Sequence, residues 1–260
     1  MKFVACVKLV PDSAAKVVAE NGQAHWGEAP LVINPWDEYA VEAALLQKEA
    51  FGGDVIAISI GNENAKEALK HALAMGCSEA ILISDPSLST ADSLMIARTL
   101  TAAIQKIGGV DIAFFGRQAI DSDTGVTAAQ AARLLSWPSL TLVTTIAALD
   151  PDARSIRVER SLEEGRQVVE SKLPAVVSVL KDFAEPRYPS FMGIRKASRA
   201  TIPTWTLTDL GLPAMQPVVS WPEMINPPQR SVTTEIIDGA TPQEIAEKLV
   251  DKILSEKVLP

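Results

Sequence analysis

Apolar residues in the first half of the chain fall in four short, nearly continuous runs that are separated by longer segments of helical periodicity. The runs cover residues 3–7, 55–60, 80–83 and 112–115. Strands buried on both faces of a parallel sheet have this composition. Residues 39–48, 65–74 and 93–107 repeat apolar side chains every three or four positions, as the buried stripe of a helix requires. The alternation predicts an α/β fold with a doubly wound, mostly parallel sheet.

The pattern changes after Trp137 and Pro138. Polar and apolar residues alternate at 155–160 and at 167–170, on either side of the turn residues 163–165. Such alternation is typical of an antiparallel β-hairpin, which we expect at about residues 155–170. A continuous apolar run at 175–180 then predicts one more buried strand.

Residues 182–228 are rich in proline, weakly periodic and too long for an ordinary connection within a compact domain. The segment is either disordered or an arm that wraps around a partner. Its apolar residues favour the arm, because disordered linkers are depleted of them. These residues include Phe191, Met192, Trp205, Leu210, Met215 and Trp221. After the arm, Thr241 precedes an amphipathic helix that we predict at residues 242–254.

Charge and cysteine content exclude several classes of protein. The 24 Lys and Arg against 32 Asp and Glu give a formal net charge of -8, which argues against nucleic acid as a partner. Cys6 and Cys77 are isolated, so neither a disulfide framework nor a metal site is expected. The first residues have the pattern of a strand rather than of a targeting segment, and no apolar stretch reaches the ~20 residues that span a bilayer. We expect a cytoplasmic protein without direct membrane insertion.

The segment GRQAIDSDTG, residues 116–125, is the clearest candidate for a binding site. It follows the apolar run at 112–115 and precedes a helical segment at 126–135. A loop at the carboxyl end of a buried parallel strand is a ligand position, and Gly116 would let the backbone approach a phosphate. Ser122, Thr124 and the first amides of the next helix would donate hydrogen bonds to it. Nucleotide binding and a structural loop that caps the helix both fit this pattern.

No side chain near this loop suggests catalysis. Asp121 and Asp123 have no His or Cys beside them that would act as a base or a nucleophile. In the segment NPWDEYAVEAAL, residues 34–45, Asp37 and Glu38 suit the positive end of a helix dipole, which alone explains them. Trp36, expected to be exposed at this turn, suits either a wall for a planar ligand or core packing. We expect a structural role for His71 and no catalytic residue.

Five motifs, read in order, resemble those of the β subunit of electron transfer flavoproteins, the family that includes FixA. They are NPWDEYAVEAAL, ALAMG, GRQAIDSDTG, SLEEGRQVVESKLPAVVSV and EPRYPSFMGIRKA, and PPQR at residues 227–230 follows them. The resemblance covers the chain nearly from end to end. It implies a Rossmann-like nucleotide-binding domain at residues 1–181, followed by a docking loop, a partner-wrapping arm and a C-terminal helix at residues 182–260.

The resemblance also places two sites on this sequence. The nucleotide site of the family falls on Cys6, Asn34, Pro35, Trp36, Asp37 and Ile60, and on Gly116, Arg117, Gln118, Ala119, Ile120, Asp121, Ser122, Asp123, Thr124, Gly125, Val126 and Thr127. The docking loop falls on residues 185–196, with Glu185, Arg187, Tyr188, Phe191, Met192, Ile194, Arg195 and Lys196 as its contact residues. Ser13 stands where some members carry a tyrosine that contacts the flavin, so that contact is not carried over.

The implied function is that of an electron carrier rather than an enzyme. An α subunit would hold the redox FAD, and this chain would hold either AMP or a second FAD. AIDSDTG resembles the electron-bifurcating branch, whereas EPRYPS and PPQR resemble the non-bifurcating branch. Electrons would come from acyl-CoA or other flavin dehydrogenases and pass to a quinone oxidoreductase or another acceptor. The alternative is an adenine-nucleotide-binding signalling or stress-type α/β protein without a redox role.

Overall fold

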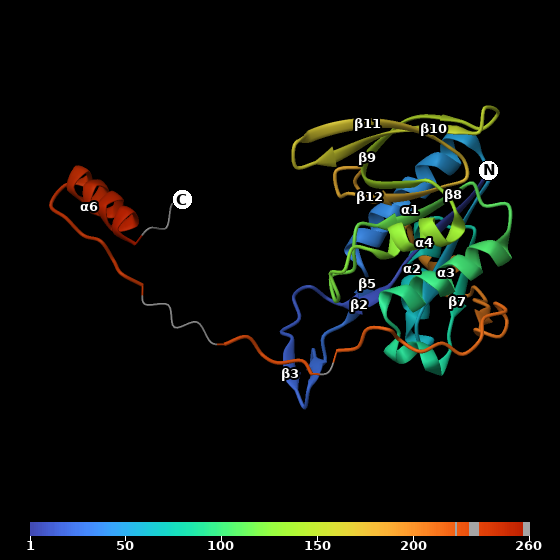
Figure 1. Cartoon of the computed structure of the whole chain (residues 1–260), viewed down its shortest axis with the longest axis horizontal. Helices are drawn as coiled ribbons and strands as arrows, with labels where there is room; N and C mark the ends of the chain where they lie inside the picture. The colour runs from blue at the N-terminus through green and yellow to red at the C-terminus, as the bar shows by residue number, and fades with distance from the viewer. Residues whose placement is uncertain (222, 229–233, 257–260) are drawn as a thin grey trace. The chain divides into compact units, whose positions relative to one another are not determined.

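The computed structural model describes residues 1–221, 223–228 and 234–256. It contains two compact units, Met1–Met224 and Ile225–Pro260. The first unit is built on a large sheet in the order β11-β10-β9-β12-β8-β1-β6-β7-β13 (Figure 1). Its central strands are parallel, as the apolar runs predict. The strands are β1 (Lys2–Cys6), β6 (Asp54–Ile60), β7 (Glu79–Ile83), β8 (Ile112–Gly116), β9 (Ser139–Asp150), β10 (Ser155–Leu162), β11 (Gly165–Lys172), β12 (Ala175–Val179) and β13 (Thr204–Trp205).

Helices cover both faces of the central strands. Successive residues of a strand point to opposite faces, so Phe3 and Phe114 pack with α1 (Pro35–Phe51) and α2 (Lys66–Met75). Val4 and Ile58 pack with α3 (Ser93–Ile107) and α4 (Thr127–Leu135) on the other face. Two short 3₁₀ helices, η1 (Glu63–Ala65) and η2 (Pro86–Thr90), follow β6 and β7. The predicted doubly wound, Rossmann-like fold is confirmed.

The hairpin expected at about residues 155–170 is formed by β10 and β11, which pair in antiparallel register. Together with β9 it extends the parallel sheet at one end. Two small antiparallel sheets were not expected. They pair β2 (Leu9–Pro11) with β5 (Leu31–Ile33), and β3 (Val18–Glu20) with β4 (Gln23–His25).

The segment expected to form an arm begins inside the first unit. Residues 191–197 form α5 (Phe191–Ala197), and β13 extends the sheet by pairing with β7. Beyond them, the backbone amides of Val218 and Val219 donate to Asp92 Oδ2 at 2.7 and 3.1 Å. The compact unit therefore ends at Met224 and not at the boundary of 181/182 that we expected. Weak periodicity hid this packing because isolated residues such as Ala197, Ile202 and Leu207 are buried without forming a regular apolar repeat.

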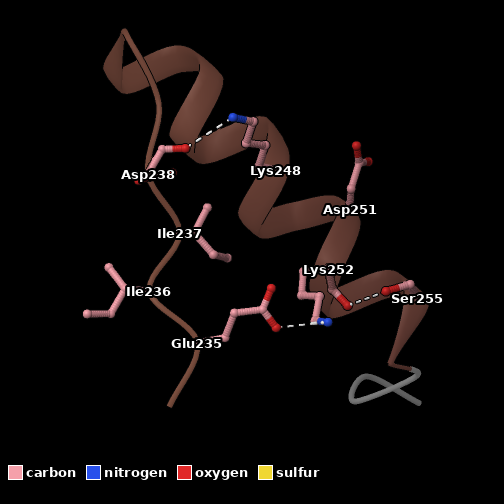
Figure 2. Close-up of a pocket in the computed structure, with 8 residues that line it drawn as sticks. All are labelled: Glu235, Ile236, Ile237, Asp238, Lys248, Asp251, Lys252 and Ser255. Atoms are coloured by element: carbon pink, nitrogen blue, oxygen red, sulfur yellow. Dashed lines mark hydrogen bonds and ion pairs between the residues drawn. The ribbon is translucent and has the colours of Figure 1, made fainter. Parts of the chain in front are cut away.

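The second unit contains α6 (Pro242–Ser255), which begins after the expected N-cap residue Thr241. None of the residues of α6 is buried, and Leu249, Val250 and Leu254 are exposed. Figure 2 shows a shallow pocket between residues 235–238 and this helix, where Lys252 pairs with Glu235 at 2.9 Å. Of the PPQR motif, Gln229 and Arg230 lie outside the described residues.

Candidate functional site

The carboxyl ends of β1 and β8 form the topological switch point of the sheet. The chain runs from β1 to β6 and β7 on one side, and then returns to place β8 on the other side of β1. Cys6, Ile60 and Gly116 are the last residues of β1, β6 and β8. The parallel registers pair Cys6 with Phe115 and with Ile58, so these strand ends lie side by side. Ligands of open α/β sheets bind at such a crevice.

The loop after β8 is tied to the start of α1 by Asn34. The Asn34 Nδ2 donates to the carbonyl of Gln118 at 2.8 Å, and Asn34 Oδ1 accepts from the amide of Ile120 at 3.1 Å. Asn34 is fully buried. The structure therefore brings together two of the segments that the sequence analysis assigned to one site.

Exposed charges hold the remainder of the loop. Lys8, directly beyond β1, pairs with Asp121 at 2.6 Å, and Gln118 Nε2 donates to Asp123. Residues 121–126 are all exposed. Asp123 and Gly125 have positive φ angles of 53° and 62°, so the loop makes a turn that a glycine eases. Sequence reasoning missed Lys8, although a basic residue directly after a buried strand was a signal for it.

The loop ends at a helix N-terminus that is open to an anion. Val126, the N-cap residue of α4, offers no side-chain hydrogen bond to the first turn. The free amides at the start of a helix, together with the helix dipole, favour a phosphate group. Ser122 and Thr124 are exposed and lie in the same loop. These features fit the phosphate of a nucleotide.

Gly116 serves a different purpose from the one expected. A Cβ added at Gly116 would lie 2.5 Å from Asp37 Oδ1 and 2.6 and 2.7 Å from the backbone carbon and oxygen of Trp36. The group that approaches this glycine is therefore the first turn of α1. The interpretation of Gly116 as room for a phosphate needs this correction, because the chain itself requires glycine here.

Asp37 also has more than the helix-dipole role that we expected. Its side chain is buried, and its Oδ2 accepts from the amide of Lys8 at 2.8 Å. Burial raises the pKa of Asp37 from 3.8 to about 7, against the opposing effect of hydrogen bonds from Asn34, Lys8 and Gly116. Asp37 thus links the ends of β1 and β8 to α1. Its neighbour Glu38 pairs instead with His71 Nε2 at 2.9 Å, in agreement with a structural role for that histidine.

The raised pKa of Asp37 predicts a loss of stability with rising pH. Between pH 3.8 and about 7 the folded protein keeps the Asp37 proton while the unfolded chain releases it. The free energy of unfolding therefore falls through this window, by on the order of 4 kcal/mol from this group. Urea unfolding of the wild type and of Asp37→Asn from pH 4.5 to 8 measures it. The wild type should lose stability relative to the variant as pH rises, and two parallel profiles would contradict the prediction.

Trp36 is half-buried and not exposed as expected. Its ring lies 5.7 Å from the guanidinium carbon of Arg117 and 6.4 Å from the ring of Tyr39. Because Arg117 belongs to the loop after β8, this contact is a further link between that loop and α1. A partly open aromatic face beside the switch point fits both the ligand-wall and the packing interpretations.

The predicted docking segment presents an apolar surface on α5. Gly193 faces α2, since a Cβ there would lie 2.3 Å from the carbonyl oxygen of Ala74. Ala197, one turn later in α5, is buried as well. The opposite side of the segment is open, with Phe191 81% and Met192 68% exposed. Tyr188, Ile194, Arg195 and Lys196 are exposed as well.

Arg187 differs from the other predicted docking residues. Its Nε and Nη2 each donate to the carboxylate of Glu42 at 2.8 Å, and its Nη1 donates to Glu49 at 2.5 Å. Glu42 is buried within α1. The guanidinium therefore holds the docking segment on the sheet domain and is not free to meet a partner. Sequence reasoning missed Glu42, whose position among the apolar residues of AVEAAL was the available signal.

Comparison with known proteins decides the family. A model of the electron transfer flavoprotein domain matches residues 27–210. The chain is 36% identical, over 266 residues and 100% of both chains, to subunit CarD of the caffeyl-CoA reductase-Etf complex of Acetobacterium woodii. It is 37% identical to the electron transfer flavoprotein subunit beta of Clostridium acetobutylicum, over 81% of this chain and 80% of that one. It is 33% identical to protein FixA of Azotobacter vinelandii, over 98% and 95% of the two chains. This chain belongs to the electron transfer flavoprotein family, on its β-subunit branch.

Membership in the electron transfer flavoprotein family makes the chain part of an electron carrier, and it implies pairing with an α subunit. Proteins of this family bind flavin and nucleotide. No helix in the described part of the chain is long and apolar enough to cross a membrane. The same residues contain no cluster of three or more His, Cys, Asp or Glu side chains that would hold a metal ion.

Proposed function

We propose that this chain is the β subunit of a heterodimeric electron transfer flavoprotein and binds an adenine nucleotide at the switch point of its sheet. The α subunit would hold the redox FAD, which supplies the electron-accepting chemistry. The heterodimer would take electrons from acyl-CoA or other flavin dehydrogenases and deliver them to a quinone oxidoreductase or another acceptor. The observation that carries the proposal is the loop after β8, which lies at the switch point of the sheet and ends at the N-terminus of α4, where the N-cap side chain makes no hydrogen bond.

The geometry of the loop supports a nucleotide more than a purely structural turn. A structural loop that caps its helix would direct a polar side chain at the first amides of α4, whereas Val126 leaves them without one. The exposed residues 121–126 leave the site open on the ligand side. AMP and a second FAD share the adenosine and the α-phosphate, so both fit these features.

The unpartnered α6 supports pairing with the α subunit. An amphipathic helix whose apolar residues Leu249, Val250 and Leu254 are exposed within its own unit needs another surface to bury them. We propose that residues 225–260 wrap around the α subunit and that the sheet domain carries the nucleotide. An obligate interface of this kind buries more than about 2,000 Å² in total.

Acid release and chromatography of the nucleotides from the co-expressed, purified heterodimer tests the proposal. One FAD with one AMP per heterodimer assigns AMP to this chain, and two FAD assign the second flavin to it. A complex that contains flavin but no second nucleotide would overturn the nucleotide site. A stable, flavin-free monomer that binds adenine nucleotides would instead support the signalling or stress-type alternative.

We further propose that the apolar surface of α5 docks the electron-donating dehydrogenase. Phe191 and Met192 project from a segment that Arg187 fixes to the sheet domain, and Arg195 and Lys196 border them. An apolar centre with a charged rim is the usual composition of a protein interface. Phe191 is exposed and therefore does not cover the core of its own chain.

Phe191→Ala should raise the apparent Michaelis constant for the heterodimer in a dehydrogenase assay by about thirtyfold, the equivalent of roughly 2 kcal/mol of lost association. Flavin content and thermal unfolding should remain near those of the wild type, because the side chain contacts little of its own chain. Val168→Ala is the matched control, since Val168 is also an exposed apolar residue, on β11 and outside α5. Equal kinetics for the two variants would contradict the docking role.

A further inference from the structure

Asn34 differs from the other predicted nucleotide-binding residues because none of its surface is accessible. The side chain donates to the carbonyl of Gln118 and accepts from the amide of Ile120, two residues further along the loop. It also forms a hydrogen bond with the buried carboxylate of Asp37, which opposes the rise in the pKa of Asp37 that burial causes. These three partners use both the donor and the acceptor groups of the amide. Because the Asn34 side chain has no accessible surface and already has these partners, it is not presented to a ligand that enters from solvent.

The backbone of Asn34 is fixed independently of the loop. Its amide donates to the carbonyl of Lys8 at 2.8 Å, and its carbonyl accepts from the amide of Asp37 at 2.8 Å. The Asp37 carboxylate in turn accepts from the amide of Lys8. The end of β1 and the start of α1 thus form one hydrogen-bonded unit, and the side chain of Asn34 extends from this unit to the loop.

The other polar link to the loop is weaker. Lys8 and Asp121 are 42% and 29% exposed in their side chains, and exposed ion pairs contribute little stability. The hydrogen bonds of Asn34 are better shielded, because Asn34 has no accessible surface and Gln118 and Ile120 are only partly exposed. We therefore attribute the conformation of residues 118–120 chiefly to Asn34 and only in small part to the ion pair.

We propose that Asn34 is a positioning residue, whose amide holds the loop after β8 in its nucleotide-binding conformation before the ligand arrives. This inference rests on the proposed nucleotide site. Because the loop is ordered in advance, binding does not have to meet the entropic cost of ordering it. Selection for the nucleotide falls to the loop backbone and the α4 N-terminus, and not to the Asn34 side chain.

The test compares the wild-type heterodimer with Asn34→Ser, after removal of the bound nucleotide. Serine is a favoured N-cap residue, so α1 keeps its start, but its short side chain does not reach both Gln118 and Ile120. AMP and FAD are titrated separately by calorimetry, and hydrogen exchange of the Ile120 amide is followed without ligand. We expect at least about a tenfold rise in the dissociation constant and faster exchange at Ile120.

A control variant separates positioning from general damage. Asn62→Ala changes an asparagine that caps η1 beyond the end of β6, outside the loop after β8. It should change the dissociation constant by less than about threefold, as expected of a surface substitution away from the site. Thermal unfolding of each ligand-free complex shows whether a change in affinity merely follows a change in global stability.

Each outcome is decisive. A wild-type complex that binds neither AMP nor FAD would refute the proposed nucleotide site, whatever the exchange at Ile120. If the wild type binds and Asn34→Ser binds equally well, the positioning role is overturned. It is also overturned if Asn34→Ser loses affinity and global stability while Ile120 exchanges as in the wild type. Should the variant not fold, rapid exchange of Ile120 in the ligand-free wild type would still contradict an ordered loop.

Discussion

Arg187→Met should lower the free energy of unfolding of the sheet domain by about 3 kcal/mol, the low end of the range for breaking a buried ion pair. The Glu42 carboxylate is buried and accepts three hydrogen bonds from Arg187, one from its backbone amide and two from its guanidinium. Without the guanidinium, the buried Glu42 carboxylate keeps only one of these three hydrogen bonds, the one from the Arg187 backbone amide. The side chain of Arg187 itself is 32% exposed, which is why we expect the low end of the range.

Urea unfolding of the single and double variants measures this effect. The double variant Glu42→Met, Arg187→Met should be more stable than Arg187→Met alone, because it removes the unpaired charge as well as its partner. Lys70→Met is the matched control, since Lys70 pairs with the exposed Glu67 on the surface of α2 and its loss should cost less than about 1 kcal/mol. Equal losses for Arg187→Met and Lys70→Met would show that the Glu42 pair does not hold the docking segment.

Gly116→Val should have a comparable or larger effect, about 3 kcal/mol or more, or should prevent folding. The new Cβ would lie within 2.7 Å of three atoms in the first turn of α1, and two of them belong to the Trp36 backbone. Backbone at the start of a buried helix has little freedom to move, so the clash cannot be relieved by a rotamer change. The change should be visible as a lower midpoint in thermal and urea unfolding.

Gly239→Ala provides the control for Gly116→Val. Gly239 also lacks a positive φ, and a Cβ there would meet only side-chain atoms of Ile245 and Glu244, at 3.1 Å or more. Its effect should stay below about 1 kcal/mol. Loss of nucleotide from Gly116→Val is expected from the damage to α1 and does not test phosphate contact. Wild-type stability in Gly116→Val would instead show that the first turn of α1 does not depend on this close approach.

Local sequence patterns determined the architecture of the sheet domain. The apolar runs at 3–7, 55–60, 80–83 and 112–115 became β1, β6, β7 and β8 because strands buried on both faces must be apolar throughout. The turn at residues 163–165 determined where the hairpin reverses direction. The periodicity of residues 93–107 determined the position of α3. The position of the candidate nucleotide loop also followed from the sequence, because parallel strands place their carboxyl ends at one edge.

Only the tertiary structure decided what the individual side chains at that edge do. Asp37 is suited to a helix dipole in the sequence, yet its burial between Lys8 and Gly116 raises its pKa to about 7. Gly116 is next to α1 only after the sheet has formed, and Arg187 meets Glu42 across 145 positions of the chain. β13 is too short to have a periodicity of its own and exists because β7 offers it an edge. Periodicity reports on neighbours along the chain, whereas these roles arise from partners that the fold brings together from distant positions.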